Sequence, residues 1–289
     1  MSAITGAQKL HAYTELIRLP KQYGTLLVLW PTLWSLFLAS GGAPEGRFLV
    51  IFIVGTFLMR SAGCVINDIA DRKFDPLVER TRTRPLAAGT LTVREALFAF
   101  AILAGLAFVL VLFLNRLTII LSFVGIALAV VYPFVKRVSH LPQTVLGMAF
   151  GWGAVMAWSA VNNTVSLAAI LIFIANIFWS MAYDTIYALM DIRDDKRVGV
   201  KSTAILFGSG VYRALYGLYI CFALAMTGVG LLLGGGFYYY TGIILSLAVF
   251  LYLVRGLRGN PVPSTAFKGF LANAVVGGFI LVFIIMDLM

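Results

Sequence analysis

Residues 48–75 read FLVIFIVGTFLMRSAGCVINDIADRKFD, an apolar run that ends in a group of acidic residues. The apolar part, 48–66, is long enough to cross the ~30 Å hydrocarbon core of a bilayer as a helix. Asn67, Asp71 and Asp75 follow directly at its end. Because carboxylates at membrane depth are costly, this group is first of all a hypothesis for a functional site.

A second apolar run, 165–189, ends in the same way. It is followed by DIRDD, in which Asp191 and Asp195 repeat the four-residue spacing of Asp71 and Asp75. An even number of membrane crossings separates the two acidic groups, so both lie on the same side of the membrane. The pattern predicts one site that is built from two parts of the chain.

The composition is typical of membrane proteins. Hydrophobic residues make up 61% and charged residues 12% of the 289 positions, and the mean hydropathy is +0.96. A bilayer has no water for unpaired backbone groups, so spanning segments are helices or closed barrels. Barrel strands alternate apolar and polar residues, and this sequence lacks that alternation. We expect an all-α fold, a polytopic membrane protein with a bundle of nine transmembrane helices around a central cavity.

The apolar runs give the boundaries of the nine expected spans. They lie near 23–41, 48–66, 96–114, 117–135, 143–161, 165–189, 212–234, 237–254 and 267–287. The segment up to about Gln22 has the pattern of a short amphipathic helix at the membrane surface. We expect a single transmembrane domain over 1–289, in which the repeated acidic motif indicates parallel halves of about 1–140 and 141–289.

Lys and Arg give the orientation, because cytoplasmic loops retain these residues. With the N-terminus inside, Arg47 and Arg116 are the basic loop residues that fall on the outer side. We expect an integral protein of a bacterial inner (plasma) membrane, with the N-terminus and the active site on the cytoplasmic side. The formal net charge of +10 comes mostly from the inner loops. It indicates no nucleic-acid partner, and no protein partner is inferred.

Helical geometry, at about 100° per residue, groups the polar residues on common faces. One face of the first helix carries Arg60, Cys64, Asn67, Asp71 and Asp75. One face of the second carries Asp184, Asp191 and Asp195. Asp68 lies at the edge of its face and Asp194 lies off it, so both rank below the carboxylates at four-residue spacing.

Inward carboxylates would repel one another unless cations neutralised them. Mg²⁺ favours one or two carboxylates together with phosphate oxygens of a substrate, so two such ions would bridge a diphosphate. Basic side chains would bind its remaining oxygens, Arg through paired hydrogen bonds. The candidates are Arg18, Lys21, Arg60, Arg72, Lys136 and Arg137.

Simpler interpretations stay open for some of these residues. A loop acid such as Asp194 is typically a solvated partner of a neighbouring base. Arg60 could extend its charge to the membrane interface, and Lys136 and Arg137 could be positively charged anchors alone. The carboxylate pairs at four-residue spacing are the features that these interpretations explain least well.

At the acidic residues the sequence resembles the UbiA-type intramembrane prenyltransferases. Their first motif, N-D-x-x-D-x-x-x-D, is matched by Asn67, Asp68, Asp71 and Asp75, and the D-x-x-x-D of their second by Asp191 and Asp195. The resemblance spans essentially the whole chain. Four strings are similar to the 4-hydroxybenzoate polyprenyltransferases within that family: LVLWPTLWSLF (27–37), AGCVINDIADRKFD (62–75), RTRPLAAG (82–89) and YDTIYALMDIRDDKRVGVKSTAILFG (183–208).

The resemblance implies a reaction of ubiquinone biosynthesis. A polyprenyl group would pass from an allylic polyprenyl diphosphate to the ring carbon ortho to the hydroxyl of 4-hydroxybenzoate, with Mg²⁺ as cofactor and release of diphosphate. The isoprenoid tail would extend toward membrane lipid. The implied metal ligands are Asn67, Asp71, Asp75, Asp191 and Asp195. The implied catalytic residues are Asp71, Asp75, Asp191, Asp195 and Arg137. The substrate-binding residues would be Arg18, Lys21, Arg60, Asn67, Arg72 and Lys136.

Other functions stay open. Prenyltransferases of the same family use other acceptors, of haem, naphthoate or chlorophyllide type, with the same diphosphate chemistry. A transporter would also line its pathway with acids and bases, but its site would lie near the membrane midplane, whereas both motifs here lie at the ends of spans. A phosphatidyltransferase would need a D-G-x-x-A-R string, which the sequence lacks.

Overall fold

The computed structural model describes residues 5–259 and 262–289, and every side chain in them except that of Arg193. Within these residues all regular elements are helices, which confirms the all-α expectation. The long helices are α2 (Tyr23–Ala39), α3 (Gly46–Asp71), α4 (Val93–Val111), α5 (Arg116–Val138), α6 (Pro142–Asn162), α7 (Leu167–Ala188), α10 (Val211–Leu233), α11 (Phe237–Gly259) and α12 (Pro263–Leu288). The short ones are α1 (Gly6–Leu16), α8 (Ile192–Val198), α9 (Thr203–Phe207) and two 3₁₀ turns, Asp75–Leu77 and Gly208–Gly210.

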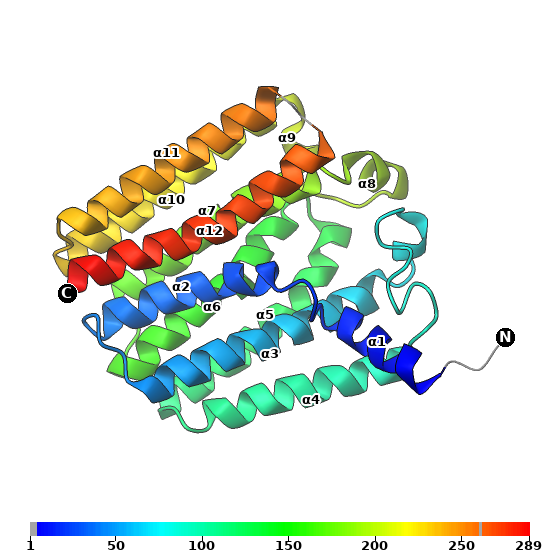
Figure 1. The fold of residues 1–289 in the computed structure, drawn as a ribbon, viewed down its shortest axis with the longest axis horizontal. Helices are drawn as coiled ribbons and strands as arrows, with labels where there is room; N and C mark the ends of the chain where they lie inside the picture. Colours follow the sequence, from blue (N-terminus) through cyan, green and yellow to red (C-terminus); the bar gives the residue numbers. More distant parts are fainter. Residues whose placement is uncertain (1–4, 260–261) are drawn as a thin grey trace.

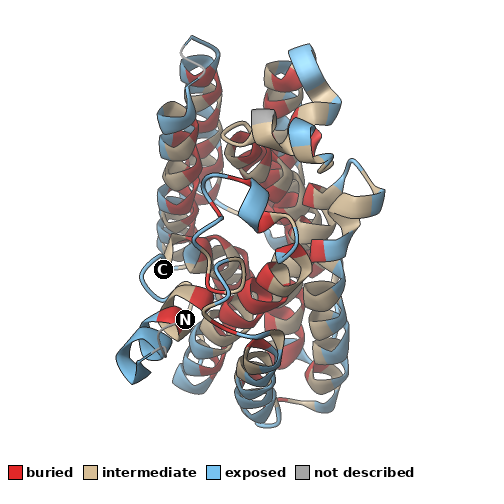
Figure 2. Cartoon of the chain, turned by 90° about the vertical axis from the view of Figure 1, so that its right-hand side faces the viewer, coloured by how far each residue is buried: buried red, intermediate tan, exposed pale blue. Residues whose placement is uncertain are grey.

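In the described residues, 8 helices are long and apolar enough to cross a membrane. The expected count of nine is not confirmed, because α2 has 17 residues and is shorter than a typical span of about 20 residues. The helices lie side by side as one bundle (Figure 1). Viewed from the end that carries α1 and α8, buried positions face the inside of the bundle and exposed positions face outward (Figure 2).

Side-chain caps explain where several of these helices begin. Thr92 accepts a hydrogen bond from the backbone of Glu95, whose own side chain returns to the backbone of Thr92, so α4 begins with a capping box. Asn115 and Ser166 cap α5 and α7. Each has an extended backbone, and its side chain accepts a hydrogen bond from a backbone N–H of the first helical turn. Asn163 ends α6 in the left-handed conformation, with φ 51°.

The first acidic motif does not lie on one continuous helix, as the sequence analysis had assumed. Helix α3 ends at Asp71, and Asp75 begins a separate 3₁₀ turn. Pro76 is consistent with the break, because proline has no backbone N–H to continue the hydrogen bonds of α3 and fits the first turn of a new helix. In the second motif, α7 ends at Ala188 and Asp191 is the residue directly before α8, without a side-chain capping bond.

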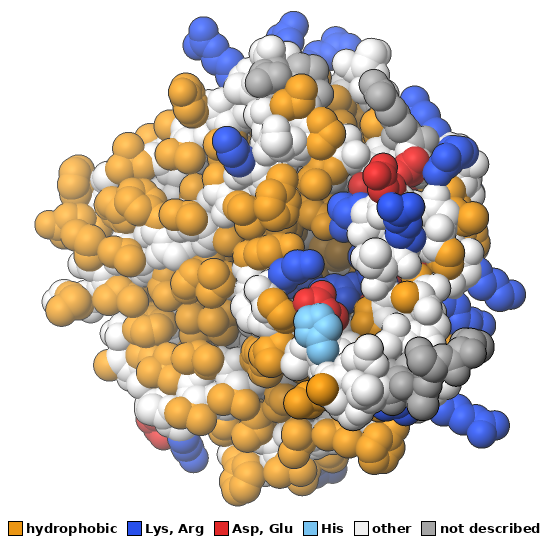
Figure 3. Space-filling model, turned by 45° about the vertical axis from the view of Figure 1, so that its right-hand side comes forward, with side chains coloured by type: hydrophobic (Ala, Val, Ile, Leu, Met, Phe, Trp, Pro, Cys, Tyr) orange, Lys and Arg blue, Asp and Glu red, His pale blue; other side chains and the backbone are white. Residues whose placement is uncertain are grey.

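The outer faces of the helices suit a lipid environment. Large apolar side chains are exposed there, among them Phe98, Phe113, Phe123, Leu224 and Ile244. Figure 3 shows such side chains over much of the bundle, with most Lys and Arg toward the end where α1 and α8 lie. Helix α1 rests across that end and buries Ala12 and Leu16 against Val65 and Leu91. This agrees with the expected amphipathic segment before the first span.

One group of buried polar side chains in the core forms hydrogen bonds between three helices. Trp34 and Trp179 lie with ring centroids 5.2 Å apart and are fully buried. Asn273 accepts hydrogen bonds from Trp179 Nε1 (2.9 Å) and Tyr219 Oη (3.0 Å) and donates to the Gly269 carbonyl oxygen (2.8 Å). Because a buried amide without partners is costly, this triad fixes the side-chain arrangement between α7, α10 and α12.

The contact between α2 and α12 depends on a glycine. A Cβ added to Gly277 would lie 2.3 Å from Trp30 Cδ1 and 2.9 Å from the ring of Trp179. The Gly277 carbonyl oxygen also accepts a hydrogen bond from Trp34 Nε1 at 3.0 Å. These contacts leave no room for a side chain at this position.

We predict that Gly277→Ala lowers the stability of the protein by about 1–3 kcal/mol, the usual cost of overpacking a tight core. The measurement is the thermal midpoint of unfolding in detergent. Gly217→Ala in α10 is the matched control, because no other side chain or distant backbone lies within 4 Å of its Cβ position. Equal midpoints for the two variants would contradict the packing argument.

Candidate active site

A cavity of about 580 Å³, here called the polar cavity, opens among the ends of α3, α5 and α7. Its acidic and amide walls include Asn67, Asp71, Asp75, Asp184, Asp191 and Asp195. Its basic walls include Arg18, Lys21, Arg60, Arg80, Arg84, Lys136 and Lys201. Figure 3 shows acidic and basic side chains beside one another around a hollow at this end of the molecule. The two acidic motifs, about 120 residues apart in the chain, therefore face one space.

Asp71, at the end of α3, is held by the basic pair at the end of α5. Lys136 Nζ donates to Asp71 Oδ2, and Arg137 Nη2 donates to Oδ1 at 2.7 Å. The Arg137 guanidinium also lies over the ring of Phe74, 3.6 Å from its centroid. Charge-assisted hydrogen bonds of this kind are the stronger ones in proteins, so α5 determines where the Asp71 carboxylate points.

Asp191 is held by a residue of the segment between α3 and α4. Arg80 Nη2 lies 2.5 Å from Asp191 Oδ2, and Arg80 Nε lies 3.0 Å from Oδ1. Arg80 Nη1 also donates to the Tyr187 hydroxyl at 2.8 Å. Arg197 Nη2 reaches the Leu77 carbonyl oxygen at 2.7 Å. These contacts tie the segment after the first motif to the helices of the second. Both parts lie at the same end of the bundle (Figure 1).

Asp68 is fully buried and lies behind the cavity wall. Its carboxylate accepts hydrogen bonds from Arg18 Nη2 at 2.7 and 2.9 Å and from Arg84 Nη1 at 3.1 Å. Arg84 also contacts Asp75 at 3.1 Å. Arg18 has a left-handed backbone, with φ 58°, which is unusual for a residue other than glycine. Asp68 therefore orients two arginines that themselves line the cavity.

Outside the membrane-spanning helices, two cavity carboxylates have raised pKa values. Burial, followed by the charge of Asp191, raises the pKa of Asp195 to about 6. Burial also raises the pKa of Asp75, although Arg84 opposes the shift. A raised carboxyl pKa means that the surroundings disfavour the negative charge, so an added cation would favour the charged form of both groups.

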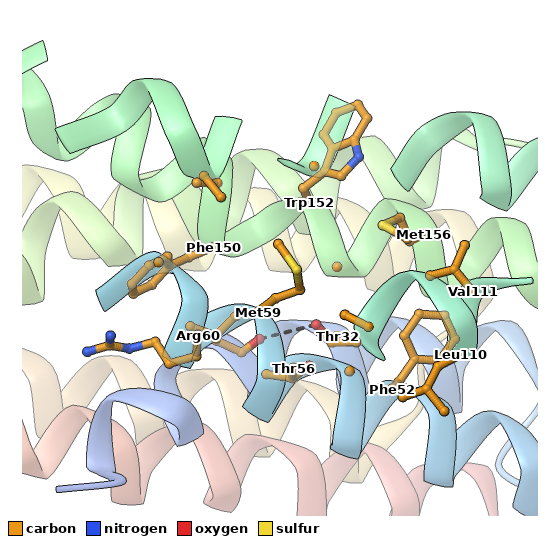
Figure 4. Close-up of a pocket in the computed structure, with 18 of the residues that line it drawn as sticks. Thr32, Phe52, Thr56, Met59, Arg60, Leu110, Val111, Phe150, Trp152 and Met156 are labelled. Carbon is orange, nitrogen blue, oxygen red and sulfur yellow. Dashed lines mark hydrogen bonds between the residues drawn. The ribbon is translucent and has the colours of Figure 1, made fainter. Parts of the chain in front are cut away.

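A smaller, apolar cavity of about 130 Å³ adjoins the polar one. Phe52, Leu110, Trp152 and Met156 are among its walls, and they come from α3, α4 and α6 (Figure 4). Three residues line both cavities: Arg60, Tyr132 and Phe150. The site as a whole can therefore accept a molecule with a charged head and an apolar tail.

Comparison with known proteins identifies the family. The profile of the UbiA prenyltransferase family matches residues 28–275. The chain belongs to this family. The 4-hydroxybenzoate octaprenyltransferase of Aeromonas salmonicida is 48% identical over 276 residues, which cover 96% of this chain and 95% of that protein. The 4-hydroxybenzoate octaprenyltransferase of Nitrosomonas eutropha is 46% identical over 284 residues, which cover 98% and 99%.

Solved structures of UbiA homologues share the fold. The apo structure of a UbiA homologue from Aeropyrum pernix K1 has a TM-score of 0.78 and 26% identity, and the match covers 92% of this chain and 98% of that one. A UbiA homologue from Archaeoglobus fulgidus bound to GPP and Mg²⁺ has a TM-score of 0.71 and 17% identity, covering 94% and 99%. At that identity the second likeness concerns the fold alone.

The structure brings most of the sequence-predicted residues of this UbiA family member to the polar cavity. Those lining it are Arg18, Lys21, Arg60, Asn67, Asp71, Asp75, Lys136, Asp191 and Asp195. Arg137 lies outside the wall but contacts Asp71. Arg72 is exposed and donates to the carbonyl oxygen of Ile69, so the structure does not bring it into the cavity.

Several charged cavity residues were not among the predicted site residues, among them Arg80, Arg84 and Asp184. Arg80 and Arg84 lie in the connecting segment, and no local pattern distinguishes them from the other loop arginines. Only the folded structure shows that Arg80 pairs with Asp191 and that Arg84 pairs with Asp68 and Asp75. Asp184 could have been predicted from the sequence. It precedes Asp191 by about two helical turns and so lies on the same helical face.

The donor set fits magnesium that is completed by a substrate. In the described part of the chain, no three His, Cys, Asp or Glu side chains lie close enough together to hold a metal ion. Mg²⁺ needs fewer, since it takes one or two carboxylates plus phosphate oxygens and water. Carboxylates from both motifs and the Asn67 amide face the polar cavity and could supply them.

We predict that Asp68→Ala destabilises the protein by about 3–5 kcal/mol, because it leaves buried arginine charge without its carboxylate. The thermal midpoint in detergent measures the effect. The control is Glu95→Gln, which removes the ion pair between Glu95 of α4 and the exposed Lys9 of α1. Exposed pairs contribute little, so that midpoint should stay near the wild-type value. A thermal midpoint of Asp68→Ala equal to that of the wild type would contradict the assigned role.

Proposed function

We propose that this chain transfers a polyprenyl group from an allylic polyprenyl diphosphate to the ring carbon ortho to the hydroxyl of 4-hydroxybenzoate. Diphosphate is released, and the reaction depends on Mg²⁺. The observation that carries the proposal is the near full-length identity of 48% with proteins named 4-hydroxybenzoate octaprenyltransferase. The joined polar and apolar cavities support it, because they match the charged head and the apolar tail of such a diphosphate.

In this proposal the basic residues bind the diphosphate head. Lys136 and Arg80 now pair with Asp71 and Asp191. Phosphate oxygens carry more negative charge than a single carboxylate, and arginine binds them in paired hydrogen bonds. Arrival of the head therefore offers these bases a new partner. The further bases in reach of the same cavity are Arg18, Lys21 and Arg84.

The carboxylates that lose their basic partners become free to hold the metal. We assign this role to Asp71, Asp75 and Asp191. We add Asp195 and the amide oxygen of Asn67, which line the same cavity. When bound, Mg²⁺ supplies Lewis-acid stabilisation of the charge on the departing diphosphate. Arg137 holds Asp71 in position, and it gains access to the diphosphate when that carboxylate turns to the metal.

The polar cavity holds the groups that leave or carry charge, and the apolar cavity surrounds the prenyl chain. The bond between the allylic carbon and the diphosphate oxygen breaks, and its electron pair leaves with the diphosphate. The ring carbon of the acceptor attacks the cation-like allylic carbon, and the ring then loses its proton. Apolar walls such as Phe150 and Met156 exclude water, which would otherwise capture the carbocation.

We further propose that the site faces the cytoplasm of a bacterial inner membrane. The basic residues of the loops support this orientation, since cytoplasmic loops retain Lys and Arg. The exposed apolar faces of the helices support contact with membrane lipid. In this orientation a soluble aromatic acid reaches the polar cavity from the cytoplasm, while the isoprenoid tail stays in the membrane.

We predict that the purified protein in lipid nanodiscs converts radiolabelled polyprenyl diphosphate and 4-hydroxybenzoate to 3-polyprenyl-4-hydroxybenzoate. Mass spectrometry identifies the product, and EDTA should abolish its formation until Mg²⁺ is restored. A panel with a dihydroxynaphthoate, haem and a chlorophyllide tests the other acceptors of the family. Preference for one of these would overturn the acceptor assignment, and uptake of unchanged substrate into vesicles would indicate a transporter.

Variants in the same assay test the acidic motifs. Asp71→Ala and Asp191→Asn should each lower turnover by at least ~100-fold, because even the loss of a group that only orients a metal ligand typically costs about 10–100-fold. Both proteins should remain folded in detergent. Glu45→Gln is the control, because Glu45 is exposed and pairs with Arg47 at the other end of α3. Near-normal turnover by a folded Asp191→Asn protein would contradict the assignment.

A further inference from the structure

The last turn of α5 carries Lys136 and Arg137, the two bases that hold Asp71. Pro133 lies inside the same helix, directly before this turn. Proline has no backbone N–H, so it cannot donate the hydrogen bond to the carbonyl oxygen four residues earlier that normally continues a helix. The turn that carries the basic pair is therefore joined to the rest of α5 by fewer hydrogen bonds than an ordinary helical turn.

The end of α5 also needs partners for its backbone carbonyl groups. The carbonyl oxygens of the last turn of any helix have no partners within the helix. The chain that follows α5 supplies one, since the Ser139 backbone N–H donates to the Val135 carbonyl oxygen at 2.8 Å. Ser139 itself has an extended backbone, so the helix stops there. The carbonyl groups of Lys136 and Val138 find their partners elsewhere in the chain.

Lys201, which follows the second acidic motif, is the partner of both groups. Its backbone N–H donates to the Lys136 carbonyl oxygen at 3.3 Å, and its Nζ donates to the Val138 carbonyl oxygen at 3.2 Å. A positive side chain at the C-terminal end of a helix also interacts favourably with the helix dipole. Lys201 therefore holds the turn of α5 that carries the basic pair.

The segment around Lys201 is itself fixed on both sides. Before it, the Val200 N–H donates to the Asp195 carbonyl oxygen at 2.9 Å. After it, the Thr203 N–H donates to Gln143 Oε1, in the first turn of α6, at 3.1 Å. Thr203 is fully buried. A segment anchored in this way can keep the end of α5 in one position.

The charge of Lys201 is not used to neutralise an acid of the site. Arg80 and Lys136, which line the same polar cavity, each form an ion pair with an aspartate. Among the described side chains, no carboxylate oxygen lies within 4 Å of the Lys201 amine. Its hydrogen bond goes to the backbone of α5 instead. This contact gives Lys201 a role that the ion pairs do not cover.

We propose that Lys201 is a positioning residue for the diphosphate site. It holds the last turn of α5 and so keeps Lys136 and Arg137 directed at Asp71 and at an arriving diphosphate. This inference rests on the proposed function and adds to it a residue that acts through the two bases. It also connects the two motifs, because the segment of Lys201 follows the second motif and α5 holds the first.

The first measurement is the Kd of a non-cleavable polyprenyl thiodiphosphate with Mg²⁺ in lipid nanodiscs. Lys201→Met removes the amine and keeps an unbranched stem, and it should weaken binding about tenfold, the effect of losing a charge-assisted hydrogen bond. Lys201→Arg keeps the charge and a donor, so it should bind more tightly than Lys201→Met. Lys196→Met is the matched control and should bind as the wild type, because Lys196 is exposed on α8 and lies outside the polar cavity.

A double-mutant cycle tests whether Lys201 acts through the basic pair. The background protein carries Lys136→Met and Arg137→Met and should itself bind the thiodiphosphate more weakly than the wild type. In this background Lys201→Met should change Kd by no more than about twofold, because no pair is left to position. The same tenfold loss in both backgrounds would overturn the proposal and give Lys201 a direct contact with the diphosphate. An unchanged Kd for Lys201→Met alone would overturn it too.

Amide hydrogen exchange tests the contact with α5 without any substrate. In the apo protein, Lys201→Met should raise the exchange of a peptide over 134–139 and leave a peptide from the middle of α7 unchanged. A direct contact with the diphosphate alone would not produce this change. Lys201→Gln, which is shorter and uncharged but keeps a polar end, covers the case in which Lys201→Met does not fold. Exchange over 134–139 equal to that of the wild type would overturn the positioning role.

Failure of this inference and failure of the proposed function give different results. A wild-type protein that does not bind the thiodiphosphate with Mg²⁺, or that prenylates only another acceptor, contradicts the proposed function. A wild-type protein that binds the thiodiphosphate and prenylates 4-hydroxybenzoate, together with Lys201→Met exchange and Kd values equal to those of the wild type, contradicts the role of Lys201 alone.

Discussion

Compensation of charge at one end of an apolar bundle is the constraint on which the rest of this structure depends. Carboxylates that end α3 and begin α8 would repel one another in a partly desolvated cavity. The chain neutralises them with bases from other elements: Lys136 and Arg137 from α5 and Arg80 from the connecting segment. These ion pairs close the end of the bundle, and they also set out the groups that a diphosphate and a divalent cation would need.

Such an arrangement explains how one cavity can hold both signs of charge without a preformed metal cage. Each acid–base pair can exchange partners, the base for a phosphate oxygen and the acid for a cation, so that the charges stay balanced when substrate and metal arrive together. Asp68 stands apart, because it is fully buried behind the wall and holds Arg18 and Arg84 in place. The acidic residues of one short motif thus have different roles. Their burial and their partners show which of them hold arginines and which face the cavity.

The sequence was sufficient for the class of fold, the approximate spans and the meeting of the two motifs, because apolar runs and residue types carry that information. It misplaced Asp75 and Asp195 on extensions of α3 and α7, since helical periodicity does not show the break before Pro76. It ranked Asp68 below the other carboxylates, and Asp68 does not line the cavity. The helical wheel could not show that Arg18 and Arg84 donate to this carboxylate. Ion pairs such as Arg80–Asp191, 111 residues apart, arise only from tertiary structure. The division into halves of about 1–140 and 141–289 stays a prediction.

The most direct test of the exchange of partners is a structure of the protein with Mn²⁺ in place of Mg²⁺ and a non-cleavable polyprenyl thiodiphosphate. Anomalous scattering locates the metal independently of the protein. The account predicts metal contacts from at least one carboxylate of each motif, Asp71 or Asp75 and Asp191 or Asp195, with Lys136 and Arg80 moved onto phosphate oxygens. A bound headgroup with the ion pairs of Asp71 and Asp191 intact, or with metal held by neither motif, would contradict it.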